Sequence, residues 1–439
     1  MHRTRRHPSE SPLRSRGRPC RSSRSSSSSV ARLFRWTGRA CQLCAAKDTV
    51  FVAQPARRLE ETSMPLSLFR AGLPLMLVLG AAGAAAQTPA DLALRPLPAD
   101  APAGRALPLR IGGRVVAGEG NLARYRRQWP GTYFEGSFQG PAVDVAVGPG
   151  EVSLRVRIDA AAPVALVRPA PGRYRVKANG PGRHRVRVDV VSESQAGATA
   201  FGGLFAPAGS TPLAAPAVRA RAIEFIGDSH TVGYGNASPA RDCTEGQVWE
   251  TTDTSQGIAG QLSRRYGAAY RVNAISGRGI VRNYGGFAAP TVPEAYPYAL
   301  FDGKTPADDA DWQPQVIVIA LGTNDFSTPL KPEERWKSRD ALHADYENRY
   351  VRFVQDLRRR SPRAFFVLWA TDLAGGEIAR EVGKVGDKLR AAGETRLAVV
   401  PVTGLSFGGC HFHPNVADDT KIADAIGKAI EGHKGVWAR

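Results

Sequence analysis

The stretch Ala222–Gly235 (AIEFIGDSHTVGYG) combines a short apolar run with a serine that directly follows a turn. The run stops at Gly227, which is typical of a buried strand of a parallel sheet, and Ser229 follows two residues later. Ligands of open α/β sheets bind at the carboxyl ends of the strands, so Ser229 is placed where a nucleophile belongs. An isolated G-D-S is more often a helix cap, so the nucleophile interpretation depends on the rest of the chain.

Three downstream motifs favour a nucleophile over a cap. They read NAISGRG at 273–279, GTND at 322–325 and His-Pro at 413–414, each beside an expected strand end. Ester hydrolysis needs a nucleophile, a base and donors to the developing oxyanion. We therefore expect Ser229 to attack and His413 to act as the base. The expected oxyanion-hole donors are the backbone N–H groups of Ser229 and Gly277, with Gly279 as the alternative to Gly277, and the side chain of Asn324.

These motifs resemble the SGNH (GDSL-type) hydrolase superfamily, and most nearly carbohydrate esterase family 2. The similar phrases are IEFIGDSHTVGYGN, SGRGIVRNY, ALGTNDFS and GCHFHPN, with WPGTYFEGSFQG upstream. The resemblance covers about residues 112–430. It implies an acetyl-ester hydrolase acting on plant polysaccharides, with a jelly-roll module packed against the catalytic domain.

The third member of the triad departs from the superfamily pattern. Relatives often carry an aspartate three residues before the histidine, where this chain has Cys410. His411 offers no carboxylate, and Asp418 and Asp419 are expected on the following helix. The resemblance to family 2 therefore implies a Ser–His dyad, with His413 Nδ1 oriented by a backbone carbonyl.

Other polar and aromatic residues near the motifs receive structural or binding roles. Asp228 and Asp325 are expected to accept loop N–H groups, and His230 and His411 lack metal-ligand spacing, so we expect no metal and no cofactor. Aromatic side chains bind sugar faces, although each alone is more often packing. We expect Phe326 and Phe412 to contact substrate; the other candidates are Trp249, Tyr284, Phe287 and Trp312.

The first 86 residues have the composition of a leader rather than of a domain. Residues 1–63 are rich in arginine and serine and show no hydrophobic period, so we expect disorder. They read either as a basic nucleic-acid arm or as translated upstream sequence, and we favour the latter, a mis-assigned start. Residues 64–86 combine Arg70, an apolar segment and a small-residue cleavage site, which is typical of a secretory signal peptide.

Removing this leader changes the charge and cysteine arguments. The whole chain has 59 basic and 40 acidic residues, and the mature part about 44 and 36, which requires no nucleic acid. Two of the 5 cysteines remain, Cys243 and Cys410, and an even count in an oxidising compartment predicts a disulfide; two free buried thiols are the alternative. We expect a secreted or periplasmic monomer with no membrane segment after Gln87.

The mature chain is long enough for two domains. Residues 95–205 show short alternating strands separated by Gly/Pro turns, which predicts a β-sandwich. The expected strands are Arg110–Ala117, Thr132–Phe138, Val143–Val147, Val152–Ile158, Tyr174–Ala178 and His184–Val191. One outer face is expected to carry Arg173, Arg175, Arg183, Arg185 and Arg187, as a solvated face or an anion- or carbohydrate-facing one. Residues 206–218 (APAGSTPLAAPAV) read as a linker.

Residues 218–435 alternate strands and helices, which predicts an α/β fold with a parallel sheet flanked by helices. One helix is expected to begin at Asp253 or Thr254, and others at 340–360 and 416–430. The leading functional interpretation is an exported O-acetyl esterase of plant hemicellulose. The alternatives are a peptidoglycan O-acetylesterase, a lipid esterase, or a non-catalytic carbohydrate-binding protein.

Overall fold

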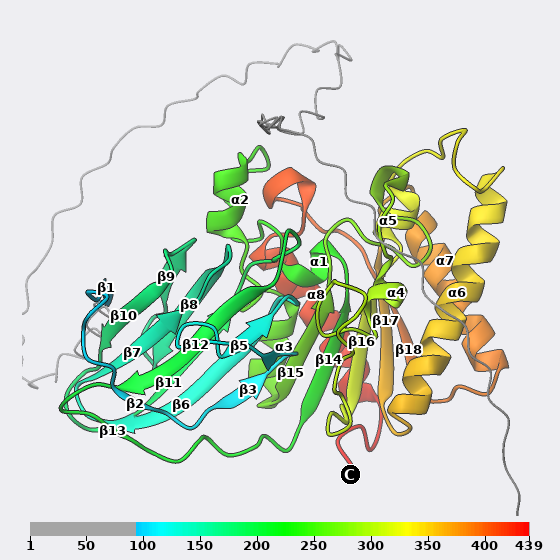
Figure 1. Ribbon diagram of the computed structural model, residues 1–439. Helices are drawn as coiled ribbons and strands as arrows, with labels where there is room; N and C mark the ends of the chain where they lie inside the picture. Colours follow the sequence, from blue (N-terminus) through cyan, green and yellow to red (C-terminus); the bar gives the residue numbers. More distant parts are fainter. Residues whose placement is uncertain (1–93, 439) are drawn as a thin grey trace, which may run out of the picture. The chain divides into compact units, whose positions relative to one another are not determined.

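Five parallel strands form the sheet that positions the motifs (Figure 1). The computed structural model describes residues 94–438, so the expected leader segments 1–63 and 64–86 lie outside the described residues. The sheet order is β15-β14-β16-β17-β18. The strands are β14 (Ala222–Gly227), β15 (Ala269–Ala274), β16 (Val316–Ala320), β17 (Phe365–Thr371) and β18 (Leu397–Val402). Gly227 is in register with Ala274 and with Ala320, so three strands end level and their loops meet at one edge.

Helices cover both faces of this sheet because its strands are apolar on both sides. Phe225 packs into one core with Leu262 and Ile422, whereas its neighbour Ile226 packs into a second core with Leu342 and Ile378. The first core involves α3 and α8, and the second involves α6 and α7. The helices are α1 (Ser229–Val232), α2 (Glu245–Thr251), α3 (Ile258–Tyr266), α4 (Val292–Ala295), α5 (Thr323–Phe326), α6 (Arg339–Arg360), α7 (Glu377–Ala391) and α8 (Val416–Gly432), with the short turns η1 (Tyr284–Gly286) and η2 (Cys410–Phe412).

Two antiparallel sheets precede the parallel sheet in the chain (Figure 1). One has the order β1-β10-β7-β12-β5-β4 with β2 on β12, and the other β13-β6-β11-β8-β9 with β3 on β6. They share an apolar core that includes Val145 and Val186. The jelly-roll topology and the domain boundaries stay predictions. The strands are β1 (Leu94–Pro96), β2 (Arg105–Ala106), β3 (Arg110–Gly112), β4 (Val116–Ala117), β5 (Tyr125–Arg127), β6 (Tyr133–Gln139), β7 (Ala142–Val147), β8 (Ser153–Ile158), β9 (Val164–Val167), β10 (Gly172–Lys177), β11 (Arg183–Val190), β12 (Thr199–Ala206) and β13 (Thr211–Pro212).

The predicted arginine face is wrong, because the five arginines lie on two different sheets. β10 carries Arg173 and Arg175, whereas β11 carries the other three. Arg175 Nε donates to the buried Asp144 at 2.7 Å. Arg187 Nη1 donates to the buried Glu135 at 2.9 Å and its guanidinium lies over Tyr133. Arg175, Arg185 and Arg187 therefore form ion pairs with the buried carboxylates of Asp144 and Glu135.

Several expected elements have different bounds. The single strand predicted at 110–117 is two strands, β3 and β4, on different sheets. The predicted linker at 206–218 contains β13, which pairs with β6, and β12 was not foreseen. α3 begins at Ile258 rather than at Asp253, because the Asp253 carboxylate accepts the N–H groups of Ser255 and Gln256 and holds a separate turn.

The described residues belong to one compact unit, and buried polar contacts join its antiparallel part to its parallel part. Trp129 is fully buried and donates Nε1–H to the carbonyl of Tyr298 at 2.9 Å. The Arg114 guanidinium, also buried, donates to the carbonyl of Tyr296 at 2.6 Å. Between residues 94 and 438, no helix combines the length and the apolar character that a membrane crossing requires.

Candidate active site

Ser229 and His413 lie in hydrogen-bond contact although 184 residues separate them in the sequence. His413 Nε2 lies 2.9 Å from Ser229 Oγ. Ser229 is the first residue of α1, and Asp228 is the N-cap whose carboxylate accepts the N–H of His230 at 3.1 Å. The G-D-S motif is thus a cap and also presents its serine, so the two interpretations of this motif are compatible.

The other ring nitrogen of His413 faces backbone carbonyls. Nδ1 lies 2.9 Å from the carbonyl oxygen of Cys410 and 3.2 Å from that of His411. Asp418 instead accepts the N–H groups of Ser406 and Phe407 within its own loop. No carboxylate among residues 94–438 makes a hydrogen bond or an ion pair with the His413 ring.

Burial keeps the site histidines neutral. Desolvation lowers the pKa of His413 to about 4, although its two carbonyl partners oppose the shift. Desolvation, followed by the proximity of His413, lowers the pKa of His230 to about 3. The His230 ring meets that of His413 edge-on at 5.6 Å, and the Tyr234 ring lies 4.5 Å from His413. An uncharged imidazole at neutral pH is the form that a general base requires.

The loop after β15 carries the two glycines considered as oxyanion donors. Gly279 N–H donates to Asn283 Oδ1 at 3.3 Å, and a Cβ at Gly279 would approach Asp325 Oδ2 to 2.4 Å. Gly277 adopts φ +78°, and its N–H has no hydrogen-bond acceptor among the described residues. Gly277 rather than Gly279 therefore keeps a free donor.

Asn324 connects this loop to the nucleophile turn. Its Nδ2 donates to Asp228 Oδ2 at 3.2 Å and to the carbonyl of Arg278 at 2.9 Å. Both amide hydrogens are thus engaged, the longer contact being to Asp228. Burial raises the pKa of Asp228 to about 7, and the N–H of His230 opposes that shift.

Asp325 has the structural role expected from the sequence. Its carboxylate accepts the backbone N–H groups of Ile280, Val281 and Arg282 at 2.9–3.2 Å. Desolvation raises the pKa of Asp325 to about 6, and these N–H groups oppose the shift. Asp325 therefore organises the turn that follows residues 275–279, which we call the oxyanion loop after the donors expected there.

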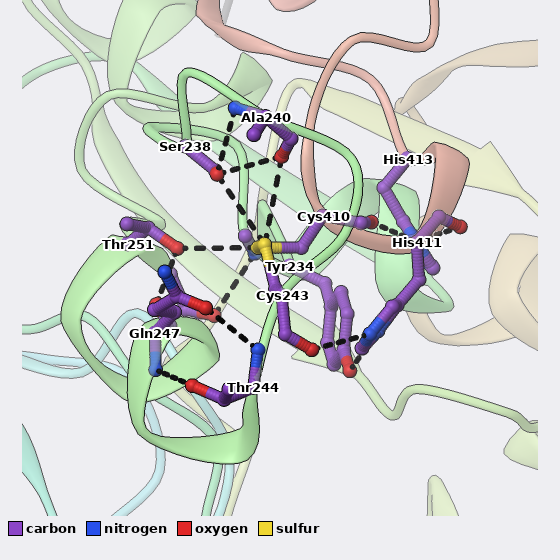
Figure 2. Close-up of a disulfide and its surroundings, with 12 residues drawn as sticks. Tyr234, Ser238, Ala240, Cys243, Thr244, Gln247, Thr251, Cys410, His411 and His413 are labelled. Carbon is purple, nitrogen blue, oxygen red and sulfur yellow. Dashed lines mark hydrogen bonds between the residues drawn. A yellow bond between two sulfur atoms is a disulfide. The ribbon is translucent and has the colours of Figure 1, made fainter.

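The predicted disulfide joins Cys243 to Cys410 and ties the loop that follows Ser229 and α1 to the loop that carries His413 (Figure 2). Gly235 permits this approach, because a Cβ there would lie 2.3 Å from Cys410 Cβ. Cys410 N–H also donates to the Gly235 carbonyl at 3.2 Å. Figure 2 shows His411 beside Tyr234, whose hydroxyl lies 3.1 Å from His411 Nδ1.

The prediction that Phe326 contacts substrate is wrong. Its side chain is 2% exposed and packs edge-on against Tyr346 at 4.7 Å, because α5 turns it into the core. Phe412, by contrast, is 61% exposed. Among residues 94–438, Tyr284 and Phe287 are the other exposed aromatic side chains, and they follow the oxyanion loop. The exposed aromatic surface therefore borders both sides of the site.

Sequence reasoning missed two residues of the sandwich that contact the oxyanion loop, Glu193 and Gln195. Ser276 N–H donates to Glu193 Oε1 at 2.7 Å, and Gln195 Nε2 donates to the Ser276 carbonyl at 3.2 Å. They occur in the polar run SESQAG, which has no motif and no periodicity. No cluster of three or more His, Cys, Asp or Glu side chains suited to a metal ion occurs among the described residues.

Comparisons with known proteins identify the family. Residues 111–216 match the family described as carbohydrate esterase 2 N-terminal, and residues 225–420 match the GDSL-like lipase/acylhydrolase family. An acetylxylan esterase / glucomannan deacetylase of Cellvibrio japonicus is 41% identical over 334 residues, which are 75% of this chain and 92% of that protein.

Solved structures of carbohydrate esterases share the fold of this chain. A carbohydrate esterase whose active site is described as displaying divergent catalytic and non-catalytic binding functions superposes with a TM-score of 0.71 at 40% identity, covering 76% of this chain and 100% of that one. A family two carbohydrate esterase from Clostridium thermocellum, in complex with cellohexaose, superposes with a TM-score of 0.65 at 26% identity, covering 75% and 99%. The chain belongs to carbohydrate esterase family 2 and is a carboxylic ester hydrolase.

Proposed function

We propose that this protein is an exported serine esterase that removes O-acetyl groups from plant hemicellulose, either xylan or glucomannan. The observation that carries the proposal is the 2.9 Å contact between His413 Nε2 and Ser229 Oγ beside a loop with a free N–H donor. The activity named for the Cellvibrio japonicus relative supports the substrate class. The signal-peptide pattern at 64–86 and the disulfide support export.

The proposed reaction has two steps. His413 Nε2 takes the proton of Ser229 Oγ, which attacks the acetyl carbonyl carbon. The tetrahedral oxyanion accepts hydrogen bonds from the N–H groups of Ser229 and Gly277. His413 then returns the proton to the sugar oxygen as this oxygen leaves. A water molecule then attacks the acetyl carbon while His413 Nε2 takes one of its protons. As the bond between that carbon and Ser229 Oγ breaks, His413 returns the proton to Oγ, and acetic acid leaves and ionises to acetate. Atoms and charges balance, and no cofactor is needed.

The proposed Ser–His dyad rests on the surroundings of His413 Nδ1. A proton on Nδ1 that is donated to the Cys410 carbonyl leaves the Nε2 lone pair facing the serine hydroxyl. A neutral carbonyl fixes this tautomer but stabilises the imidazolium less than a carboxylate does. Asn324 is the third oxyanion donor in this proposal. It exchanges its longer bond, to Asp228, for one to the oxyanion.

The decisive experiment measures acetate release by the protein from Gln87 onward. Acetylated xylan, acetylated glucomannan and O-acetylated peptidoglycan are compared, with Ser229→Ala as the inactive control. We expect release from a plant polysaccharide and its loss in the control. Release from peptidoglycan alone would mean that peptidoglycan, and not hemicellulose, is the substrate. If the folded protein released no acetate from any of the three, the proposal would be overturned.

A second candidate function is binding of a plant polysaccharide without turnover. The observation in its favour is that Tyr284, Phe287 and Phe412 are exposed in loops beside the site. Exposed aromatic rings suit the apolar faces of sugars. Ser229→Ala separates the two functions, because it removes turnover and leaves these rings in place. Retained binding of unacetylated oligosaccharide by this variant, lost in Phe412→Ala, would support the binding function.

A further inference from the structure

The backbone of the oxyanion loop is satisfied at every polar group but one. A buried or partly buried backbone N–H or C=O normally has a partner. Between the N–H of Ile275 and the C=O of Gly279, only the N–H of Gly277 makes no hydrogen bond among the described residues. The other groups are partnered by the Gly227 C=O, the Arg278 N–H, Glu193, Gln195, the Tyr284 N–H, Asn324, Asn283 and the Val292 N–H.

Two of these partners come from the sandwich rather than from the hydrolase module. Glu193 and Gln195 follow β11 and hold opposite sides of one residue, Ser276. Glu193 accepts the Ser276 N–H at 2.7 Å, and Gln195 donates to the Ser276 C=O at 3.2 Å. We name Glu193 and Gln195 the clamp.

The clamp is itself anchored in the sandwich. Ser153 N–H donates to Ser192 Oγ at 2.8 Å, just before the clamp. Gln128 Nε2 donates to the Ser194 carbonyl at 3.0 Å, between the two clamp residues. The clamp therefore holds the loop at the end of β15 in a fixed position relative to the sandwich.

The geometry of the peptide bond links the clamp to the oxyanion donor. The C=O of Ser276 and the N–H of Gly277 belong to the same peptide unit, which is planar and trans. Fixing the direction of that C=O therefore fixes the N–H in the opposite direction. Gly277 has no Cβ and adopts φ +78°, so it opposes rotation of this peptide less than another residue would.

From these contacts we infer that Glu193 and Gln195 are positioning residues that hold the Gly277 N–H toward the developing oxyanion, so that the sandwich completes the active site. The inference rests on the proposed function of Gly277 as a donor. It assigns the sandwich a part in turnover in addition to any part in binding polysaccharide. Loss of the clamp should then weaken binding of the transition state more than binding of the substrate.

The test compares Gln195→Ala, Gln195→Glu, Glu193→Ala and Glu193→Gln in the full mature protein. Gln195 is exposed and borders a pocket of about 740 Å³, so its truncation leaves packing intact. Gln195→Glu sets a carboxylate against the Ser276 carbonyl and should be worse than Gln195→Ala. Glu193→Gln keeps an acceptor for the Ser276 N–H and should retain most activity. The matched controls are Gln139→Ala, at the exposed end of β6, and Glu151→Gln, whose side chain is 58% exposed.

The readouts are kcat and KM for 4-nitrophenyl acetate, the affinity for an alkyl boronic acid, and the melting temperature. A boronic acid bonded to a serine Oγ places a charged oxygen in the oxyanion hole and so mimics the transition state. Loss of a whole donor costs about 10²–10³ in rate, so we expect a loosened donor to cost about 10- to 100-fold in kcat. Boronate affinity should fall in parallel with kcat/KM, with KM and the melting temperature unchanged.

Three results would overturn the inference. They are an unchanged kcat in Gln195→Ala and Glu193→Ala, a loss confined to KM, and a loss of kcat with unchanged boronate affinity. The small ester requires no polysaccharide, so failure of the wild-type protein on xylan or glucomannan would contradict the proposed substrate and leave this test standing. Absence of wild-type activity on the small ester as well would contradict the proposed catalytic role of the site.

Discussion

The proposed base, His413, and the proposed oxyanion donor, Gly277, define two sides of the site, the base side and the oxyanion side, which different parts of the molecule hold in place. His413 is fixed by the carbonyls of its own loop, and the Cys243–Cys410 disulfide ties that loop to the loop after the nucleophile. The oxyanion loop is held at Ser276 by two side chains of the sandwich. The base side is thus assembled within the parallel-sheet module, whereas the oxyanion side depends on packing between modules. The two sides should therefore fail under different perturbations.

The largest effect is expected when either the proposed nucleophile or the proposed base is removed. Ser229→Ala or His413→Ala should lower kcat by about 10⁴–10⁶, because nucleophile and base act as a unit. The double variant should cost little more than either single one. Single-turnover acetate release with a folding check by circular dichroism would measure this. Additive losses would mean that the 2.9 Å contact is not the reacting pair.

The next effect tests whether Asn324 belongs to the oxyanion side. Asn324→Ala removes the proposed side-chain donor and should lower kcat by about 10²–10³ with little change in KM. It also removes the contact between the nucleophile turn and the Arg278 carbonyl, so thermal unfolding must be followed together with kinetics. An unchanged kcat in the folded variant would mean that Asn324 is not an oxyanion donor.

Loss of the disulfide should perturb the base side. Replacing both Cys243 and Cys410 by serine should lower the free energy of unfolding by about 2–5 kcal/mol, because the bridge closes a long loop. Looser placement of His413 should lower kcat by up to about 10²-fold. Denaturant unfolding and kinetics are measured with and without dithiothreitol. The serine variant serves as the control, because reductant should change only the wild-type protein.

The pH dependence of activity should report the burial of His413. Its pKa of about 4 means that the base is neutral at higher pH, so kcat/KM should fall only as pH drops through about 4. The folded pKa values of His413 and His230 lie below the ordinary 6.5, so the stability that these two neutral rings contribute should be lost from about pH 6.5 downward. The raised pKa values of Asp228 and Asp325 act in the opposite direction over the same range, so the change in stability is compared between the wild-type protein and His230→Gln. Melting temperatures at each pH separate the two effects. An acid limb near pH 6.5 with the fold intact would contradict this account.

The smallest expected effect tests for a hidden carboxylate on the base side. Asp419 is fully buried and its Oδ2 accepts from Asn236 Nδ2 at 2.8 Å, so it makes no hydrogen bond with His413. The change in kcat should stay below about tenfold, whereas loss of a triad carboxylate costs about 10⁴. Steady-state kinetics would measure it, with the melting temperature as a check on the Asn236 contact. A loss of several powers of ten would contradict the dyad.

Local sequence predicted the elements that carry the chemistry. The apolar runs before Ser229 and Asn324 form β14 and β16, because strands that are apolar on both faces must be buried between helices. The parallel register then brings their loops to one edge. The cysteine count likewise predicted the Cys243–Cys410 disulfide, which the structure contains.

Failures occurred where a side chain's direction depends on distant partners. Phe326 is adjacent in sequence to a site motif, yet α5 turns it into the core against Tyr346. The arginines of β10 and β11 share a pattern in the sequence but lie on different sheets. Neither outcome follows from periodicity, because periodicity describes one strand or helix and not what packs against it.

The sequence by itself therefore determined the family and the parallel α/β sheet, and it predicted the nucleophile, base and side-chain donor that we propose. Only the tertiary structure decided which glycine N–H remains free and which residues hold it. Gly277 and Gly279 are equivalent in the SGRG motif, and they differ because Asn283 takes the N–H of Gly279. Glu193 and Gln195 carry no local signal, since their role exists only once the sandwich packs beside the end of β15.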